Sequence, residues 1–420
     1  MERKLAIPLL IIIAVAVVMA AVSISLGYAG LNNNDTSGSV SANGTFSVLP
    51  DLNPPTLSDA GLRVEKVIEG LVQPTSMAFL DHDDLLILQK NDGRVRHVTN
   101  GTLQPDPVHE VSVDGVSERG MLGVAVANAT GDSKTVFLYY TESDGGEIRN
   151  RVYRHDDWSG SGNLGGGTLI LDLPGEPGPN HDGGKMIIGP DGMLYTVIGD
   201  LNRNGMLQNF PNGPEPDDTS VIFRVDRDGN AVNNGTNNKY YAYGIRNSFG
   251  LDFDPLTGIL WDTENGPAGY DEINVVEQGF NSGWEQIMGP IDRTGRTTET
   301  LVQFEGSHYA DPVFSWSVSQ GVTDIEFLNS TKLGDRYAYN IFVGDINNGN
   351  LYFFTVNQDR TGLEIGGAGL EDLVADSDTE AQAVTLGTNF GGITDIETGP
   401  DGHLYVLSFS GSLYRIVPAS

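Results

Sequence analysis

The amino-acid sequence predicts an all-β protein, a six-bladed β-propeller preceded by an N-terminal transmembrane helix. Six similar units recur along the chain, each with a short apolar run, a turn built on Asp-Gly or a relative, and a second apolar run. No window beyond the N-terminus shows sustained helical periodicity. Glycine supplies 54 of 420 residues, nearly twice its usual ~7% share, which is typical of a chain rich in loops.

The first 27 residues are predicted to form a membrane anchor. Residues 5–26 carry no charge, and at ~1.5 Å per residue a helix of this length spans roughly 33 Å, enough to cross a bilayer. Arg3 and Lys4 precede the apolar run, so the positive-inside rule places the rest of the chain on the extracellular face of the membrane. A cleaved signal peptide, which would leave a secreted protein, is the alternative, although its apolar part usually has only ~7 to 15 residues.

Residues 28–57 are rich in Asn, Ser, Gly, Thr and Pro and are predicted to form a flexible stalk, which leaves residues 58–420 as the folded domain. Glycosylation sequons compatible with an exported glycoprotein begin at Asn34, Asn43, Asn100, Asn128, Asn234 and Asn329. The chain has no cysteine, so stability must come from a large core, metal ions or both.

The chain is strongly acidic, with 56 acidic against 24 basic residues and a net charge of -32. Such a charge repels nucleic acids and anionic membrane surfaces, so neither is expected as a partner. The acidic groups suit either a solvated surface in a salty exterior or the binding of hard divalent cations, which prefer oxygen ligands. Net charge alone does not separate these two interpretations.

Each repeated unit predicts consecutive antiparallel strands. The units begin at Met77, Met121, Met186, Gly250, Ile325 and Ile393. Asp-Gly favours the positive backbone angles of a hairpin turn, and the flanking runs are rich in Val, Ile, Leu and Tyr. Regular all-β units indicate a propeller, in which each blade buries its faces against its neighbours. A β-sandwich or a pair of barrels is the alternative that strand spacing alone would allow.

Four polar loops between these units are candidates for a functional site. They are SERGMLG (117–123), PNHDGGK (179–185), YGIRNSFG (243–250) and ENGPAGYDEIN (264–274). In a propeller, loops from all blades converge on a central region, so residues that are distant in sequence meet there.

Three residues in these loops suit proton and carbonyl chemistry. His181 has an ordinary pKa of ~6.5 and can act as a general base, although a histidine beside glycines is also typical of an exposed loop. Arg246 and Asn247 offer a planar cation and an amide that can polarise a carbonyl. A purely structural arginine that binds neighbouring carbonyls is the alternative.

The loop ENGPAGYDEIN is a candidate metal site. Asp271 and Glu272 supply carboxylates, and a Gly-Pro turn can leave two successive carbonyls pointing outward as ligands for a hard cation. A structural role for the DEIN segment as an anchor between blades is equally compatible with the sequence. No zinc-ligand spacing, P-loop or dinucleotide fingerprint is present.

Taken together, these stretches resemble the glucose/sorbosone dehydrogenase family, aldose sugar dehydrogenases that use pyrroloquinoline quinone (PQQ) and calcium. The resemblance runs from about residue 61 to residue 418 and is carried by GMLGVAVAN, NHDGGKMIIGPDGMLYTVIGD and YGIRNSFGLDFDPLTGILWDTENGPAGYDEIN. It implies a six-bladed propeller and the oxidation of an aldose at its anomeric carbon to a lactone.

The resemblance also implies roles for individual residues. His181 would be the general base that removes the proton of the anomeric hydroxyl. Arg246 and Asn247 would contact the reactive carbonyl region of the quinone. The backbone carbonyls of Gly266 and Pro267 would hold calcium, which acts as a Lewis acid on the cofactor.

The chain departs from the family pattern at positions that bind the carboxylates of PQQ. The family commonly has a lysine in the segment that matches FVGDINNG and an Arg-x-Arg pair before the segment that matches TDIETGPDG, whereas this chain has no cation at either place. Lys185, Arg119 or Arg203 are candidate substitutes. The predicted cofactor-binding set is Asn180, Lys185, Glu118, Arg119, Asn347 and Thr394.

Two further functions stay open at this point. The missing cations favour a non-redox propeller module that has lost quinone binding and binds a glycan or a surface partner. A calcium-dependent lactonase is supported only by analogy with other six-bladed propellers.

Overall fold

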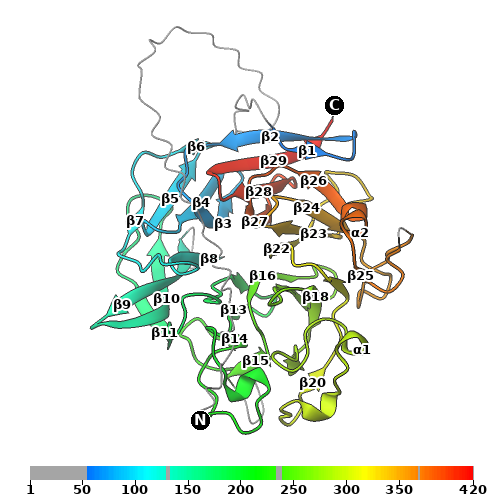
Figure 1. The fold of residues 1–420 in the computed structure, drawn as a ribbon. Coiled ribbons are helices and arrows are strands. Elements are labelled where there is room, and N and C mark those ends of the chain that lie inside the picture. The colour runs from blue at the N-terminus through cyan, green and yellow to red at the C-terminus, as the bar shows by residue number, and fades with distance from the viewer. Residues whose placement is uncertain (1–53, 129–132, 233–238, 368, 420) are drawn as a thin grey trace, which may run out of the picture. The chain divides into compact units, whose positions relative to one another are not determined.

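The computed structural model describes residues 54–128, 133–232, 239–367 and 369–419. Residues 43–420 form one compact unit, and the architecture given below is that of its described part. The strands of this part form six separate sheets, which are arranged around a common axis (Figure 1).

The sheets are numbered here by the chain order of their first strands. The first sheet contains β3 (Pro74–Asp81), β4 (Asp84–Gln89), β5 (Arg94–Thr99), β6 (Thr102–Leu103) and β7 (His109–Glu110). The second contains β8 (Met121–Asn128), β9 (Lys134–Asp144), β10 (Glu147–Trp158) and β11 (Thr168–Pro174). The third contains β12 (Met186–Ile188), β13 (Leu194–Ile198), β14 (Val221–Val225), β15 (Tyr240–Tyr243), β19 (Phe280–Asn281) and β20 (His308–Tyr309).

The remaining three sheets follow the same plan. The fourth contains β16 (Ser248–Phe253), β17 (Leu260–Glu264), β18 (Asp271–Val276), β21 (Phe314–Trp316) and β25 (Val374–Ala375). The fifth contains β22 (Val322–Phe327), β23 (Ile341–Asp345), β24 (Leu351–Phe354), β26 (Thr385–Thr388) and β1 (Thr56–Leu57). The sixth contains β27 (Ile393–Thr398), β28 (Leu404–Ser408), β29 (Ser412–Pro418) and β2 (Leu62–Ile68).

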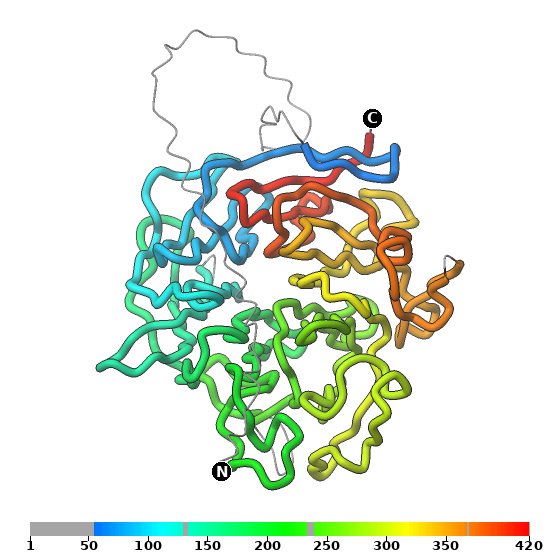
Figure 2. The backbone as a smooth tube through the Cα atoms, viewed as in Figure 1, coloured from blue at the N-terminus to red at the C-terminus, as the bar shows by residue number. Residues whose placement is uncertain are grey.

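The first strands of the six sheets line the common axis. Contacts link β3 to β8, β8 to β12, β12 to β16, β16 to β22, β22 to β27, and β27 back to β3, so these strands form a closed ring (Figure 2). The ring closes because the sixth sheet takes strands from both ends of the described chain, with β2 antiparallel to β29. The buried Arg415 of β29 pairs with the buried Glu65 of β2 at 2.6 Å.

The hydrophobic core consists of six clusters, and each cluster lies between two neighbouring sheets. The clusters join sheets one to two, two to three, three to four, four to five, five to six, and six to one. The second strands are the most buried, because every residue of β13, β17, β23 and β28 is buried. Each sheet therefore buries both of its faces against neighbours, which is the packing of a propeller.

The predicted all-β propeller is confirmed by this arrangement. Met121, Met186 and Ile393 are the first residues of β8, β12 and β27, and the other three predicted unit starts lie inside first strands. Helix is restricted to α1 (Ile291–Thr294), α2 (Asp378–Ala383) and the 3-10 turns η1 (Met206–Gln208) and η2 (Thr298–Thr300) within the described ranges. A β-sandwich or a pair of barrels lacks a closed ring of six first strands, so this alternative does not describe the fold.

The predicted anchor at residues 1–27 and residues 28–53 of the predicted stalk lie outside the described residues. None of the described helices is long and apolar enough to cross a membrane. The last two residues of the predicted stalk, Thr56 and Leu57, form β1 and pair with β26.

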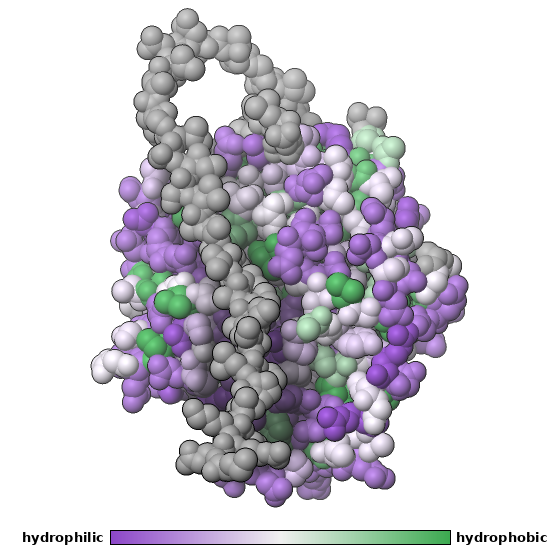
Figure 3. Space-filling model, viewed as in Figure 1, coloured by the Kyte–Doolittle hydropathy of each residue, from purple (hydrophilic) through white to green (hydrophobic). Residues whose placement is uncertain are grey.

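The surface agrees with the acidic composition. The face seen in Figure 3 is mainly hydrophilic where it is not covered by grey atoms, and its hydrophobic residues are scattered. The sequon residues Asn100, Asn128 and Asn329 are exposed, as glycosylation requires, while the other three sequons lie outside the described residues. Glycosylation stays a prediction.

Candidate functional site

The predicted catalytic residues meet at one end of the first strands. Arg246 and Asn247 lie directly before β16, and His181 lies in the loop that leads to β12. Gly199 and Asp200 follow β13 and join the two segments, because the Gly199 amide donates to the His181 carbonyl (3.1 Å) and the Asp200 amide donates to the Arg246 carbonyl (2.9 Å). Backbone hydrogen bonds therefore hold His181 and Arg246 on the same side of the ring.

Gly199 is required for this close approach. A Cβ atom at residue 199 would lie 2.4 Å from the Arg246 carbonyl oxygen and 2.7 Å from that of His181. Both distances are far below van der Waals contact with backbone atoms that cannot move independently. A side chain at position 199 would therefore push the two candidate segments apart.

Asp200 fixes the orientation of His181, whose residue is only 6% exposed. His181 Nδ1 lies 2.5 Å from Asp200 Oδ1, and a carboxylate can only accept, so Nδ1 carries the proton and Nε2 keeps its lone pair. Asp200 is held in turn by Trp284 Nε1, which donates to Oδ2 at 2.8 Å, and by the Asn202 amide, which donates to Oδ1 at 2.8 Å. His181 Nε2 is therefore the nitrogen that can accept a proton from a substrate.

The backbone of His181 is also constrained. Its φ is 66°, in the left-handed region, where a residue with a side chain is uncommon. The Glu118 carboxylate accepts the His181 amide at 2.5 Å. Glu118, predicted as a cofactor-binding residue, thus contacts the site through the backbone of the histidine. Strain of this kind is often found where a side chain must be aimed at a ligand.

Arg246 lies beside this histidine pair. Its guanidinium packs over the Trp284 ring at 5.2 Å, and its Nη1 donates to the carbonyls of Asn265 (2.7 Å) and Gly266 (3.1 Å). Burial lowers the pKa of Arg246, and the carboxylates of Asp200 and Glu264 act in the opposite direction. The guanidinium is therefore partly desolvated, which strengthens its attraction for a developing negative charge.

Two polar atoms at this position have no partner among the described residues. Arg246 Nε and Asn247 Oδ1 are both buried and make no hydrogen bond there. Buried polar atoms are normally satisfied, so an unpaired donor next to an unpaired acceptor indicates a place for a polar ligand. Arg246 Nε, the donor, fits the reactive carbonyl region that the predicted cofactor would present, whereas Asn247 Oδ1 needs a donor group from the ligand.

Glu264 binds the backbone of Arg246. It accepts from the Arg246 amide (2.6 Å) and from Ser282 Oγ (2.6 Å), and burial raises the pKa of Glu264 to about 7. Asp262 and Glu272 lie on the same two strands, where Glu264 and Glu272 are directly opposed. Burial also raises the pKa of both well above the ordinary value.

The predicted calcium ligands lie in different settings, and calcium binding at the carbonyls of Gly266 and Pro267 stays a prediction. Gly266 and Asp271 are close, since the Gly266 amide donates to Asp271 Oδ1 at 3.0 Å, and Pro267 is exposed. Asp271 Oδ2 accepts two further amides, and Glu272 is the next residue of β18, so its side chain points to the opposite face of the sheet. No group of three or more His or acidic residues within the described ranges could hold a metal ion.

The predicted cofactor-binding residues are split between the site and other places. Asn180 lies next to His181 and accepts a hydrogen bond from Ser117 Oγ. Arg119 is 7% exposed, contacts Asp114 Oδ2 at 3.2 Å and donates to the Gly175 carbonyl. Arg119 is thus engaged within the protein.

The other three residues of this set, Lys185, Thr394 and Asn347, supply no free positive charge at the site. Lys185 is buried and pairs with Asp324 (2.8 Å) and Asp395 (2.7 Å) on the axis of the ring. Thr394 Oγ1 donates to the Pro74 carbonyl at 3.0 Å. Asn347 is exposed in the turn after β23. The structure therefore shows no replacement for the family cations at these positions.

Sequence reasoning missed three residues of the site. Asp200 ends the quoted stretch TVIGD, and an acid directly after a strand that follows the histidine loop is a usable signal. Trp284 and Lys90 had no such signal, because their positions depend on the fold. Lys90 is 9% exposed, its ammonium donates to Asn91 Oδ1 (3.0 Å) and the Gly115 carbonyl (3.1 Å), and burial lowers its pKa.

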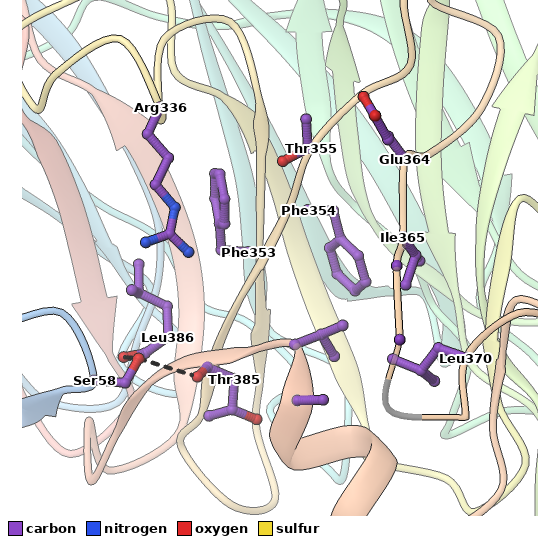
Figure 4. A pocket seen from close by; sticks show the side chains of 14 residues that line it. Ser58, Arg336, Phe353, Phe354, Thr355, Glu364, Ile365, Leu370, Thr385 and Leu386 are labelled. Carbon is purple, nitrogen blue, oxygen red and sulfur yellow. Dashed lines mark hydrogen bonds between the residues drawn. The ribbon is translucent and has the colours of Figure 1, made fainter.

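A cavity of about 280 Å³ lies elsewhere, beside β24, β26 and α2. Figure 4 shows Arg336, Glu364, two phenylalanines and the hydrogen bond from Ser58 Oγ to the Thr385 carbonyl. None of the catalytic candidates lines this cavity. It is separate from the site around His181.

Comparisons with known proteins agree with this geometry. The family model for Glucose / Sorbosone dehydrogenase matches residues 71–415. The aldose sugar dehydrogenase YliI of Escherichia coli (strain K12) is 27% identical over 380 residues, which cover 86% of this chain and 94% of that protein.

Solved structures give the same result. The crystal structure of the soluble aldose sugar dehydrogenase of Escherichia coli in its apo-form has a TM-score of 0.68 at 25% identity and covers 85% of this chain and 99% of that one. The PQQ-bound form of the aldose sugar dehydrogenase of Streptomyces coelicolor has a TM-score of 0.65 and covers 86% and 99%. At 22% identity, this second likeness shows the fold alone.

Proposed function

Because this chain belongs to the glucose/sorbosone dehydrogenase family, we propose that it is a PQQ-dependent sugar dehydrogenase that oxidises the anomeric carbon of aldoses to lactones. The observation that carries the proposal is the His181–Asp200 pair, placed beside Arg246 at one end of the first strands. This places a base, its orienting acid and a cation together, as proton removal from a hydroxyl requires.

The chain's own residues perform the proton chemistry. Asp200 holds the proton on His181 Nδ1, so Nε2 accepts the proton of the anomeric hydroxyl as the C–O bond becomes a carbonyl. Asp200 also stabilises the imidazolium that forms. Bound PQQ would supply the acceptor for the hydride that leaves the anomeric carbon. Arg246 would donate from its unpaired Nε to the carbonyl end of the cofactor, and Asn247 Oδ1, which only accepts, would take a donor group of the bound ligand.

The fit of the cofactor is uneven. Its reactive end matches Arg246 and Asn247, whereas no described cation stands at the predicted positions for its carboxylates. Lys90 is a candidate for this role, since the hydrogen bonds of its ammonium go to neutral oxygens, and it interacts electrostatically with Glu118. Calcium is proposed at the carbonyls of Gly266 and Pro267, and membership of the glucose/sorbosone dehydrogenase family supports the quinone.

The finer architecture belongs to the same proposal. We take each of the six sheets as one blade of a six-bladed propeller, in keeping with the closed ring of first strands. We also propose that residues 1–27 anchor the protein to the membrane with the propeller outside, which is supported by the uncharged run at residues 5–26.

A non-redox propeller module that binds a glycan or a surface partner is the second candidate. The commitment of Lys185 and Arg119 to internal contacts favours it, because neither can replace the missing cations.

Dye reduction by the purified chain with an aldose, calcium and PQQ tests the proposal. We expect cofactor-dependent oxidation that falls by about 10²-fold or more in H181A, because a positioned base contributes roughly that factor. The matched control is H308A, which removes a half-exposed histidine on β20 and should keep full activity. Activity that H181A leaves unchanged, or no activity with saturating cofactor, would refute the proposal.

A further inference from the structure

A second cavity lies at the opposite end of the first strands. It has a volume of about 430 Å³, and its lining includes the carboxylates of Asp252, Glu326 and Glu397. Each of these is the last residue but one of its strand, β16, β22 and β27, and these three strands are neighbours in the ring. Six residues separate Arg246 from Asp252, or about 20 Å at ~3.3 Å per residue, so this cavity is distinct from the catalytic site.

Backbone amides hold two of the three carboxylates, those of Asp252 and Glu326. Asp252 accepts from the amides of Phe253 (2.7 Å) and Phe327 (2.7 Å). Glu326 accepts from the Thr398 amide (2.8 Å). The ion pairs of the described residues link this group to Lys185 alone, which reaches Glu397 at 3.8 Å. The backbone thus fixes Asp252 and Glu326, and among the described residues Lys185 is the one cation that pairs with the group.

Two more buried acids, Asp324 and Asp395, form ion pairs with that lysine. Lys185 Nζ contacts Asp324 Oδ2 (2.8 Å) and Asp395 Oδ1 (2.7 Å), which lie two residues before Glu326 and Glu397 and so share their faces of the strands. Five carboxylates therefore share one ammonium, which contacts three of them, Asp324, Asp395 and Glu397. Asp324 is 0% exposed, and its Oδ1 has no hydrogen-bond partner among the described residues.

The protonation of the cluster agrees with a shortage of positive charge. Burial raises the pKa of Asp252 to about 6 and that of Glu397 to about 8. Burial, followed by repulsion from Asp252 and Glu397, raises the pKa of Glu326 well above its ordinary value. Without a further cation, some of these groups are kept neutral.

The shape of the cavity favours an organic cation over a metal ion. No three acidic side chains of the described part converge closely enough to hold a metal. A volume of about 430 Å³ is that of a small-molecule site, and Phe253, Pro255 and Pro400 add apolar lining between the acids. Ammonium groups donate to separately placed oxygens, and a methylene chain suits the apolar lining.

We propose that the cavity between Asp252, Glu326 and Glu397 binds an aliphatic polyamine, whose ammonium groups pair with these carboxylates at the end of the propeller opposite His181. The site is independent of the proposed sugar oxidation. Its occupant supplies the positive charge that Lys185 alone does not provide.

Calorimetric titration of the full chain with spermidine at constant ionic strength tests the proposal. We expect one spermidine per chain, and at least tenfold weaker binding to the E326Q/E397Q double variant. The control E299Q removes an exposed acid on η2 and should bind spermidine as the unaltered chain does. The heat should also vary with the ionisation enthalpy of the buffer, because ammonium binding expels protons from the raised carboxyls.

The comparison titrations use calcium chloride and sodium chloride. The proposal is overturned if spermidine shows no single saturable site, if the double variant binds it as tightly as E299Q does, or if calcium alone binds in a manner sensitive to the double variant. Thermal denaturation without ligand establishes folding, and the double variant should melt no lower than the unaltered chain. If it does not fold, E397Q alone takes its place with the same criteria.

Discussion

Asp200 determines which nitrogen of His181 can act as the base. An asparagine at position 200 can offer its amide nitrogen to Nδ1, which allows the proton to move to Nε2 and blocks the base. We expect D200N to lower kcat by about 10²-fold with little change in KM, since only the proton transfer is affected. Steady-state dye-reduction kinetics measure both constants.

The control for D200N is D292N, an exposed aspartate in the first turn of α1. It should leave kcat unchanged. A D200N variant with the kcat of the unaltered chain would show that the carboxylate does not orient the imidazole.

Asp262 is a buried acid whose two oxygens both lack partners in the described structure. The pKa of Asp262 in the folded state lies well above the ordinary 3.8. The unfolded state therefore releases this proton at lower pH than the folded state does. As a result, the contribution of Asp262 to stability falls as pH rises above about 4. The D262N side chain does not ionise, so this loss of stability at higher pH does not occur in the variant. We expect D262N to stabilise the protein by at least about 1 kcal/mol at pH 7, with little gain at pH 4.

Thermal melts of D262N and the unaltered chain from pH 4 to pH 8 test this expectation. A difference in Tm that does not grow with pH would contradict the assignment of a buried, raised carboxyl.

Residues of the candidate site could be selected from the sequence where they stand in a distinctive order, and their catalytic roles stay a prediction. His181, Arg246 and Asn247 stand in such stretches, and the structure brings them together. The pairing of Lys185 with Asp324 and Asp395 could not be foreseen, because it joins three sheets across the axis, 139 and 210 residues apart. Contacts of that kind are set by tertiary packing rather than by local pattern.

At the scale of elements, β2 and β29 close the ring. Burial acts to raise the pKa of Glu65, but the hydrogen bonds and charges of Arg415 and Arg63 together outweigh it and hold this pKa below its ordinary value. E65A would leave a buried guanidinium whose remaining carboxylate partner among the described residues is Asp401, at 3.4 Å. We expect a loss of about 3 kcal/mol in the free energy of unfolding, measured by chemical denaturation.

The control for E65A is R63A, which removes the half-exposed second partner of Glu65. Its effect should stay below about 1 kcal/mol. Equal losses in the two variants would argue against the closing role of the buried pair.

The first strands were predictable as elements, whereas several outer strands were not. The repeats identify the first strands because their turn residues and apolar runs are local signals. The two-residue strands β19, β20 and β25 join their sheets in parallel with partners distant in sequence. Nothing in their own short sequences specifies that pairing, since it depends on where the long loops are held.

At the scale of the whole molecule, the net charge of -32 opposes folding through mutual repulsion. Salt screens this repulsion, with a Debye length of about 10 Å at 0.1 M and about 3 Å at 1 M. We therefore expect Tm to rise as sodium chloride increases from 0.05 to 1 M, whereas the same osmolality of a neutral sugar alcohol should have a smaller effect. A Tm that does not depend on salt would contradict this account of the acidic surface.

The central claim is that the end of the ring around His181 is a quinone-dependent sugar-oxidising site. Calorimetric titration of the full chain with PQQ, with and without calcium, tests it most directly. The account predicts a single site that calcium strengthens and that H181A retains, because the histidine acts on the sugar rather than holding the cofactor. Absence of saturable PQQ binding in both conditions would contradict it and favour the non-redox propeller.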